Sequence, residues 1–152
     1  ALTARIAAIA MAMVSVKSNP ETIVLGFTGK DNVFPLDVSA RRRLDDNVRE
    51  LERRVKGTST DAAGPYLWAI ATRTHADAFE LYTDNETWAG DIHPSQALEV
   101  YRRNYGPTRQ INVAMTAVNY GTNDPLDVNS LNVVGFDASA PEVMRQFING
   151  EV

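Results

Sequence analysis

Residues 81–94 read Leu-Tyr-Thr-Asp-Asn-Glu-Thr-Trp-Ala-Gly-Asp-Ile-His-Pro, and this stretch decides the fold that we expect the chain to adopt. An apolar run over residues 78–82 ends in polar residues 83–87, and a helical pattern begins after Pro94. A buried strand that ends in this way is typical of open α/β sheets, where ligands bind just beyond the carboxyl ends of the strands. Carboxylate and hydroxyl oxygens suit hard cations such as Mg²⁺. The stretch therefore predicts one wall of a divalent-cation site.

On both sides of this stretch, helical and extended patterns alternate along the chain. The predicted helices cover residues 3–17, 44–55, 61–74, 95–104 and 140–148. The predicted strands cover residues 21–27, 33–36, 78–82, 110–117 and 132–135, and the second is the hairpin partner of the first. Alternation of this kind indicates an α/β fold with a mostly parallel central sheet and helices on both faces. The segment 119–129 is rich in Asn, Asp and Gly, and we expect a surface excursion without metal ligands.

The composition fits one soluble domain with a real core, since 44% of the 152 residues are hydrophobic and 22% are charged. A net charge of -4 does not favour a large RNA-binding face on this domain. The absence of Cys excludes disulfide and zinc-thiolate frameworks and is compatible with the cytoplasmic location that we predict. The apolar segment 6–16 is too short to cross a bilayer and indicates a buried Ala-rich helix, so we expect no membrane contact.

A second candidate for ligands is the segment Gly57-Thr58-Ser59-Thr60-Asp61, in which hydroxyl side chains precede a predicted helix. Taken alone, this pattern is an ordinary helix N-cap. In a parallel sheet, however, this loop and the loop that carries Asp84 would fall on the same edge. A hydroxyl from one loop and a carboxylate from the next would then make a plausible magnesium site.

Several runs resemble the von Willebrand factor A domain of the Ro (TROVE) ribonucleoproteins. The strongest are Tyr-Thr-Asp-Asn-Glu-Thr-Trp-Ala-Gly at 82–90, the pair His93-Pro94, and Ala-Leu-Glu-Val-Tyr-Arg-Arg at 97–103. Val-Gly-Phe-Asp at 134–137 and Val-Met-Arg-Gln-Phe at 143–147 also fit. The resemblance implies a single Rossmann-like von Willebrand A domain over residues 1–152.

The resemblance also implies a metal-ion-dependent adhesion site (MIDAS) built from three loops, which would bind Mg²⁺ or another divalent cation. The threonine loop of the family matches Thr60, and its aspartate loop matches Asp84. Further residues of these two loops could support the ligands or join them; they are Ser59, Asp61 and Glu86.

The first loop of such a site, Asp-x-Ser-x-Ser, should end a strand just before the first helix. We therefore expect residues 1–152 to lack the first strand and this loop, and to be unstable without them. The segment Asp37-Val38-Ser39 is a tempting substitute, but Arg41 stands where the second Ser is required and the preceding strand is a different one. We interpret it as a loop that only resembles the motif.

In the resembling family, small noncoding or misfolded RNA is held mainly by a separate ring of helical repeats. The resemblance therefore implies RNA binding through the parent protein, with a metal site on this domain that takes an acidic protein ligand. Two alternatives stay open. One is a Mg-dependent phosphoester hydrolase in which Asp84, Glu86 and His93 activate water. The other is a structural docking domain whose metal site is unused.

No nucleophile or general base stands at a recognisable spacing, so we predict that the domain is not an enzyme. Basic clusters at 41–43, 53–56 and 102–103 could contact RNA phosphate, but they also fit ordinary solvated helix faces. His93-Pro94 fits a structural turn ahead of a helix better than a catalytic role.

Overall fold

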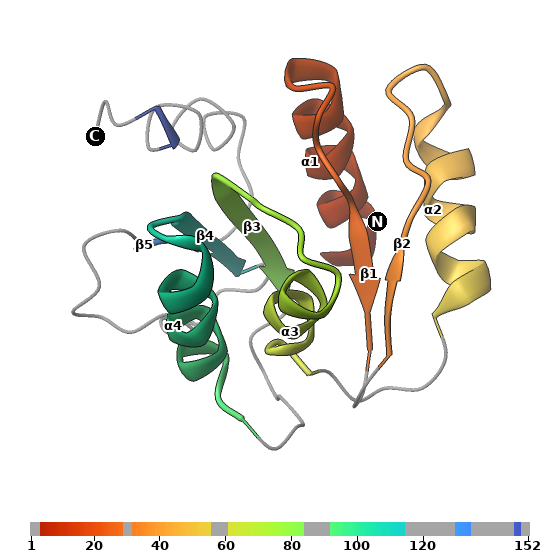
Figure 1. Ribbon diagram of the computed structural model, residues 1–152. Coiled ribbons are helices and arrows are strands. Elements are labelled where there is room, and N and C mark those ends of the chain that lie inside the picture. Colours follow the sequence, from red (N-terminus) through yellow and green to blue (C-terminus); the bar gives the residue numbers. More distant parts are fainter. Residues whose placement is uncertain are drawn as a thin grey trace.

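The computed structural model describes residues 4–28, 32–55, 61–83, 92–114, 130–134 and 148–149. Its helices are α1 Ala4–Ser18, α2 Leu44–Arg54, α3 Gly64–Ala71 and α4 Pro94–Tyr105 (Figure 1). Its strands are β1 Leu25–Phe27, β2 Val33–Pro35, β3 Ala78–Thr83, β4 Arg109–Ala114 and β5 Ser130–Val134. The predicted order of elements is confirmed over these ranges. The segment 119–129 and most of the predicted helix 140–148 lie outside the described residues.

The larger sheet contains β3, β4 and β5 in that order, and all neighbouring strands are parallel. Leu81, Ile111 and Val113 are buried in it. Phe79 makes an edge-to-face contact with Tyr66 of α3, with ring centroids 5.0 Å apart. The next residue, Glu80, accepts a hydrogen bond from Ser15 of α1. Because successive strand residues point to opposite faces, α1 and α3 cover opposite faces of this sheet, as the α/β interpretation predicts.

The smaller sheet is the predicted hairpin, in which β1 and β2 are antiparallel and Phe27 pairs with Val33. Gly26 lets the ring of Phe34 approach the backbone, because a Cβ at this position would lie 2.6 Å from Cζ of Phe34 and would force the ring to move. The hairpin packs on α1 and α2 through a buried apolar cluster. Its buried members are Ile9, Ala12, Phe34, Leu36, Val38 and Val48.

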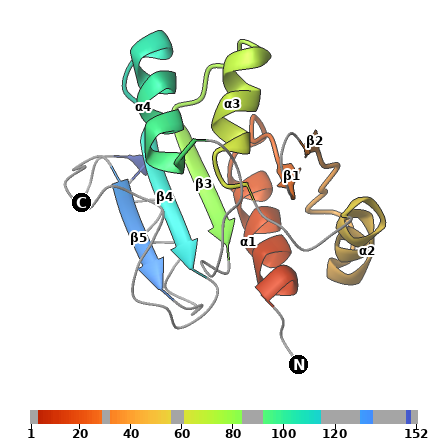
Figure 2. The same cartoon turned by 90° about the horizontal axis from the view of Figure 1, so that it is seen from below.

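The same two helices, α1 and α3, pack on both sheets. Among the described residues, no strand of one sheet pairs with a strand of the other. α1 packs on β2 through the apolar cluster and on β3 through Ser15. α3 contacts both strands of the hairpin, and its Tyr66 packs on β3. In both views of the ribbon, α1 lies between the hairpin and β3 (Figures 1 and 2). Within the described part of the chain, β1 and β3 therefore each have one paired edge.

The helix predicted over 61–74 is shorter, because α3 begins at Gly64 and ends at Ala71. Its start is set by a turn, in which the Ala63 N–H donates to Oδ1 of Asp61 over 3.1 Å. Its end is set by Arg73, which adopts a left-handed conformation with φ 56°. The Thr74 N–H then donates back to the Ala69 carbonyl over 2.9 Å. This pattern satisfies the last carbonyls of a helix and stops it.

Candidate metal site and its surroundings

The structure describes one chain neighbour of each predicted metal ligand. Thr60 and Asp84 themselves lie outside the described residues. The same holds for Ser59 and Glu86, so the predicted convergence of these side chains stays a prediction. Asp61 and Thr83, which directly adjoin the two proposed ligands, are both placed.

Asp61 is a buried carboxylate, with only 5% of its surface exposed. Its backbone N–H donates to the Thr28 carbonyl over 2.9 Å, and its own carbonyl accepts from the Gly64 N–H over 3.1 Å. Its Oδ1 accepts from the Ala63 N–H. Thr28 directly follows the last residue of β1. The residue after Thr60 is therefore held beside the carboxyl end of β1, which is where ligands bind in open α/β sheets.

Thr28, which accepts the hydrogen bond from Asp61, is also bonded to Asn32, the residue directly before β2. Its N–H donates to the Asn32 carbonyl over 3.0 Å, and the Asn32 amide donates to its hydroxyl. Thr28 is buried as deeply as Asp61, with 6% exposure. Sequence reasoning missed both Thr28 and Asn32. The available signal was the polar run Thr28-Gly-Lys-Asp-Asn32 after a strand, which looks like any hairpin turn.

His93, nine residues after Asp84 in the chain, caps α4. Its Nδ1 accepts from the Ser95 N–H over 3.1 Å, while its own N–H donates to Oε1 of Gln96 over 3.2 Å. This reciprocal pair is a capping box, here with His in place of the usual hydroxyl residue. The structural role expected for His93-Pro94 is confirmed, because Pro94 occupies the first turn of α4.

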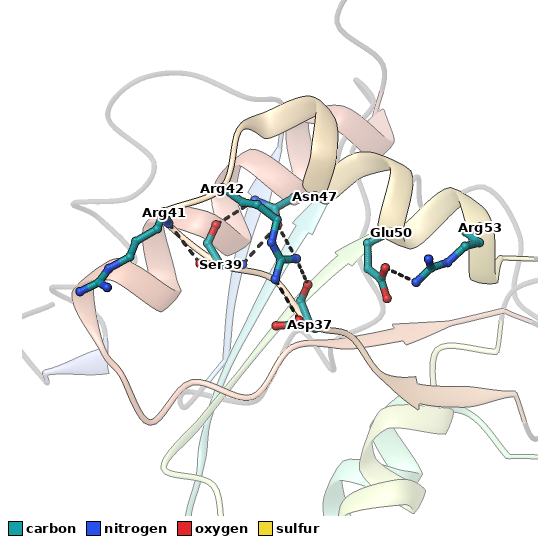
Figure 3. Close-up of polar contacts among 7 residues, drawn as sticks. All are labelled: Asp37, Ser39, Arg41, Arg42, Asn47, Glu50 and Arg53. Carbon is teal, nitrogen blue, oxygen red and sulfur yellow. Dashed lines mark hydrogen bonds and ion pairs between the residues drawn. The ribbon is translucent and has the colours of Figure 1, made fainter.

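Asp37 and Ser39 take part in a polar cluster of their own (Figure 3). Oδ2 of Asp37 accepts from the Arg42 guanidinium over 2.9 Å, and Oγ of Ser39 accepts from the Arg41 N–H over 3.2 Å. The fully buried Asn47 side chain holds the backbone of Ser39 through both of its polar atoms. These groups are occupied in shaping the loop before α2, which supports the interpretation of Asp37-Val38-Ser39 as a structural loop. Among the described residues, no group of three or more His, Cys, Asp or Glu side chains could hold a metal ion.

Comparison with known proteins gives a consistent match over nearly the whole chain. Residues 1–148 match the family model described as the Ro60 vWA domain. The chain belongs to the Ro60 vWA domain family. Over 99% of its length it is 40% identical to the RNA-binding protein RO60 of Deinococcus radiodurans, and 32% identical to the RNA-binding protein RO60 of Caenorhabditis elegans.

Solved structures show the same relationship. The crystal structure of the Deinococcus radiodurans RO (RSR) protein superposes with a TM-score of 0.86 at 39% sequence identity, over 99% of this chain and 30% of that one. The von Willebrand A fold predicted from the sequence is thereby confirmed. The chain spans 28% of the Deinococcus relative and 23% of the Caenorhabditis relative. It therefore corresponds to under a third of either protein.

The basic clusters of this Ro60 vWA domain are largely paired within the domain. In the first cluster, Arg42 pairs with Asp37 over 2.9 Å and Arg43 approaches Asp45 at 3.4 Å. In the third, Arg103 pairs with Glu99 over 3.1 Å. Exposed pairs of this kind contribute about 0–1 kcal/mol to stability, but they balance the charge locally.

In the middle cluster, Arg53 and Arg54 are the last residues of α2, and both are engaged within the domain. Arg53 pairs with Glu50, as Figure 3 shows. Arg54 stacks on the ring of Phe34 at 4.5 Å from its centroid and donates to the Pro35 carbonyl over 2.9 Å. The expectation of ordinary helix faces accounts for these contacts.

Two tyrosines of the Ro60 vWA domain donate their hydroxyl hydrogens to side chains of the larger sheet. Tyr66 donates to Oε1 of Gln110 over 2.6 Å between α3 and β4. Burial raises the pKa of Tyr66, and the nearby Arg102 charge opposes that rise. Burial also raises the pKa of Tyr82, and the charge of Glu80 adds to the effect. Both phenols are therefore neutral hydrogen-bond donors at physiological pH.

A depression is present between two helices in the described part of the chain. It measures about 620 Å³ between α1 and α2, and its lining includes Ile6, Leu44 and Val48. The carboxylate of Asp45 on its rim is shared between Arg43 and Arg49. Besides these apolar side chains, the lining of the depression holds charged residues of both signs, Arg43, Asp45, Arg49 and Glu52. Among the described helices, none is long and apolar enough to cross a membrane.

Proposed function

We propose that this domain binds a divalent cation through Thr60 and Asp84 and uses it to hold an acidic side chain of a protein partner. The donor set fits the ion, because a hydroxyl and a carboxylate are the oxygen ligands that Mg²⁺ prefers. When bound, the cation would supply an open coordination position for the partner's carboxylate. The observation that carries the proposal is the hydrogen bond from the Asp61 N–H to Thr28, which holds the neighbour of Thr60 at the end of β1.

We also infer that a further strand belongs between β1 and β3 and brings the Asp-x-Ser-x-Ser loop to this site. Both sheets share α1 on one face and α3 on the other, and β1 and β3 each have one paired edge among the described residues. A strand in that place would be covered by helices on both faces. It would therefore be apolar on both faces, as in buried parallel sheets.

For the parent protein, we propose binding of noncoding RNA outside this domain. The relatives are named RNA-binding proteins, and this chain spans under a third of each. The net charge of -4 and the local pairing of Arg42, Arg53 and Arg103 do not favour a phosphate-binding face here. Any RNA contact of the domain alone should be weak and should fall steeply with salt, because it would rest on phosphate charge.

The test of metal binding is thermal melting of the intact protein against Mn²⁺ or Mg²⁺ concentration. At 100 times its Kd, the ion should add about 2.7 kcal/mol of stability. Asp84→Asn and Thr60→Ala should each reduce that gain without unfolding the metal-free protein. Asp37→Asn is the matched control, since this exposed carboxylate pairs with Arg42 and should leave the gain unchanged.

Equal metal-induced shifts in all four proteins would show that Thr60 and Asp84 are not ligands. No shift in any of them would favour a docking domain without a working metal site. Turnover of a phosphoester substrate that depends on Mg²⁺ and is lost in Asp84→Asn would favour the hydrolase instead. Tight, salt-resistant binding of structured RNA by residues 1–152 alone would contradict the placement of RNA recognition elsewhere.

A further inference from the structure

We propose that Asp61 is a positioning residue of the metal site, which fixes the Thr60 loop through backbone hydrogen bonds and does not ligate the ion. The inference rests on the proposed metal-binding function and assigns a role to a residue that the sequence left open between ligand and support. Asp61 is the buried carboxylate next to Thr60 in the chain, with 5% exposure.

The first step of the argument is the direction of the Asp61 side chain. Its Oδ1 accepts from the Ala63 N–H over 3.1 Å, so this oxygen is turned back toward the start of α3. Residues at the start of a helix have backbone N–H groups without partners inside the helix, and a side-chain oxygen that accepts from one of them stabilises the turn. The carboxylate therefore shapes the connection between the Thr60 loop and α3.

The second step is the anchorage of the Asp61 backbone. Its N–H donates to the Thr28 carbonyl over 2.9 Å, and the Gly64 N–H donates to its carbonyl over 3.1 Å. Thr28 is itself held by Asn32 through the backbone and the side chain. One residue thus ties the loop after α2 to two elements that are remote in sequence, the β1–β2 turn and α3. Such anchorage fixes the position of the residue that directly follows Thr60 in the chain.

The third step separates this role from metal ligation. A backbone N–H needs only an oxygen acceptor, and Asn or Ser provides one at a helix start about as well as Asp does. A cation ligand depends instead on the negative charge. Substitutions that keep the acceptor and remove the charge therefore distinguish the two roles.

The experiment measures the Kd of Mn²⁺ for the intact protein by calorimetry, well below the melting temperature of every variant. Asp61→Ala should weaken Mn²⁺ binding by about five- to tenfold, which is the size expected for loss of one such hydrogen bond. Asp61→Asn and Asp61→Ser should both bind within about twofold of the parent. Val48→Ala is the control for general destabilisation, because this buried residue lies in the apolar cluster between α1, α2 and β2. It should lower the melting temperature and leave the Kd unchanged.

Each remaining outcome overturns the assignment in a recognisable way. If Asp61→Asn and Asp61→Ser lose affinity as Asp61→Ala does, Asp61 acts through its charge and is a ligand. If Asp61→Ala binds Mn²⁺ like the parent and only melts earlier, its role is confined to folding. If the parent protein itself binds no Mn²⁺, the proposed function fails and this inference fails with it. If only Thr60→Ala and Asp84→Asn lose affinity, the metal site stands without Asp61.

Discussion

Ser15 and Glu80 lie 65 residues apart in the chain, and the Ser15 hydroxyl donates a hydrogen bond to Oε2 of Glu80 over 2.7 Å. The Tyr82 hydroxyl donates to the same oxygen over 3.0 Å. The contact joins α1 to β3, next to the edge at which we infer a further strand. Glu80 lies on the sheet face that α1 covers, and its carboxylate needs hydrogen-bond donors there. Burial of a charged group without such donors costs free energy.

Ser15→Ala should lower the free energy of unfolding by about 1–2 kcal/mol, because it removes a hydrogen bond to a partly buried charged group. The measurement is urea unfolding at neutral pH. Ser18→Ala is the matched control, since Ser18 is an exposed residue of the same helix and should change stability little. Equal effects of the two substitutions would show that the contact contributes nothing beyond helix propensity.

A designed apolar strand that ends in Asp-x-Ser-x-Ser, joined ahead of Ala1, should raise the free energy of unfolding of residues 1–152 by at least about 3 kcal/mol. The estimate takes two or more large apolar side chains at about 1.5–3 kcal/mol each. Thermal or urea unfolding measures the gain. A scrambled extension of the same composition should give none, and an equal gain from it would contradict a specific place between β1 and β3.

Arg73→Gly should raise the free energy of unfolding by up to about 1 kcal/mol, because glycine adopts a positive φ without the steric cost that other residues meet. Arg73 has φ 56° at the end of α3. The same replacement at Arg103, inside α4 and exposed, should instead cost about 1 kcal/mol. Chemical denaturation of both variants measures whether the two changes in the free energy of unfolding have opposite signs. Destabilisation by Arg73→Gly would contradict the left-handed conformation of Arg73.

The burial of Tyr66 leads us to expect that the folded protein loses stability in strong alkali. Burial raises its pKa above the usual value of 10.0, so the folded protein keeps the phenol proton to higher pH than the unfolded chain. Its contribution is complete below about pH 10, and it is lost as the pH rises further, because the unfolded state then releases the proton first.

Tyr66→Phe should therefore be less stable than the parent at neutral pH, by about 1–2 kcal/mol, because it leaves Gln110 without this donor. The gap between the two proteins should narrow from pH 9 to pH 11. Urea midpoints at both pH values measure it. A constant gap would mean that the Tyr66 hydroxyl titrates alike in the folded and unfolded states.

Several features of the structure were predictable because their causes are local in sequence. The apolar run that ends at Tyr82 and the polar residues after it mark the end of β3 at Thr83. The pair His93-Pro94 marks the start of α4, since a cap and a proline in the first turn act within a few residues. The hairpin of β1 and β2 followed from two short apolar runs around a turn. The metal ligands were proposed in the same way, from side-chain chemistry at the ends of predicted elements, and they stay a prediction because Thr60 and Asp84 lie outside the described residues.

By itself, the sequence determined the order of helices and strands, the family, and the loops from which metal ligands are expected. Only the tertiary structure decided that Asp61 is tied to Thr28 and that Ser15 meets Glu80. The physical reason is the range of the interactions. Periodicity and capping depend on residues a few positions apart in the chain. The contacts of Asp61 and Ser15 instead arise when the chain packs α1 and α3 on opposite faces of one sheet. No local pattern encodes which distant partner a buried polar group will find.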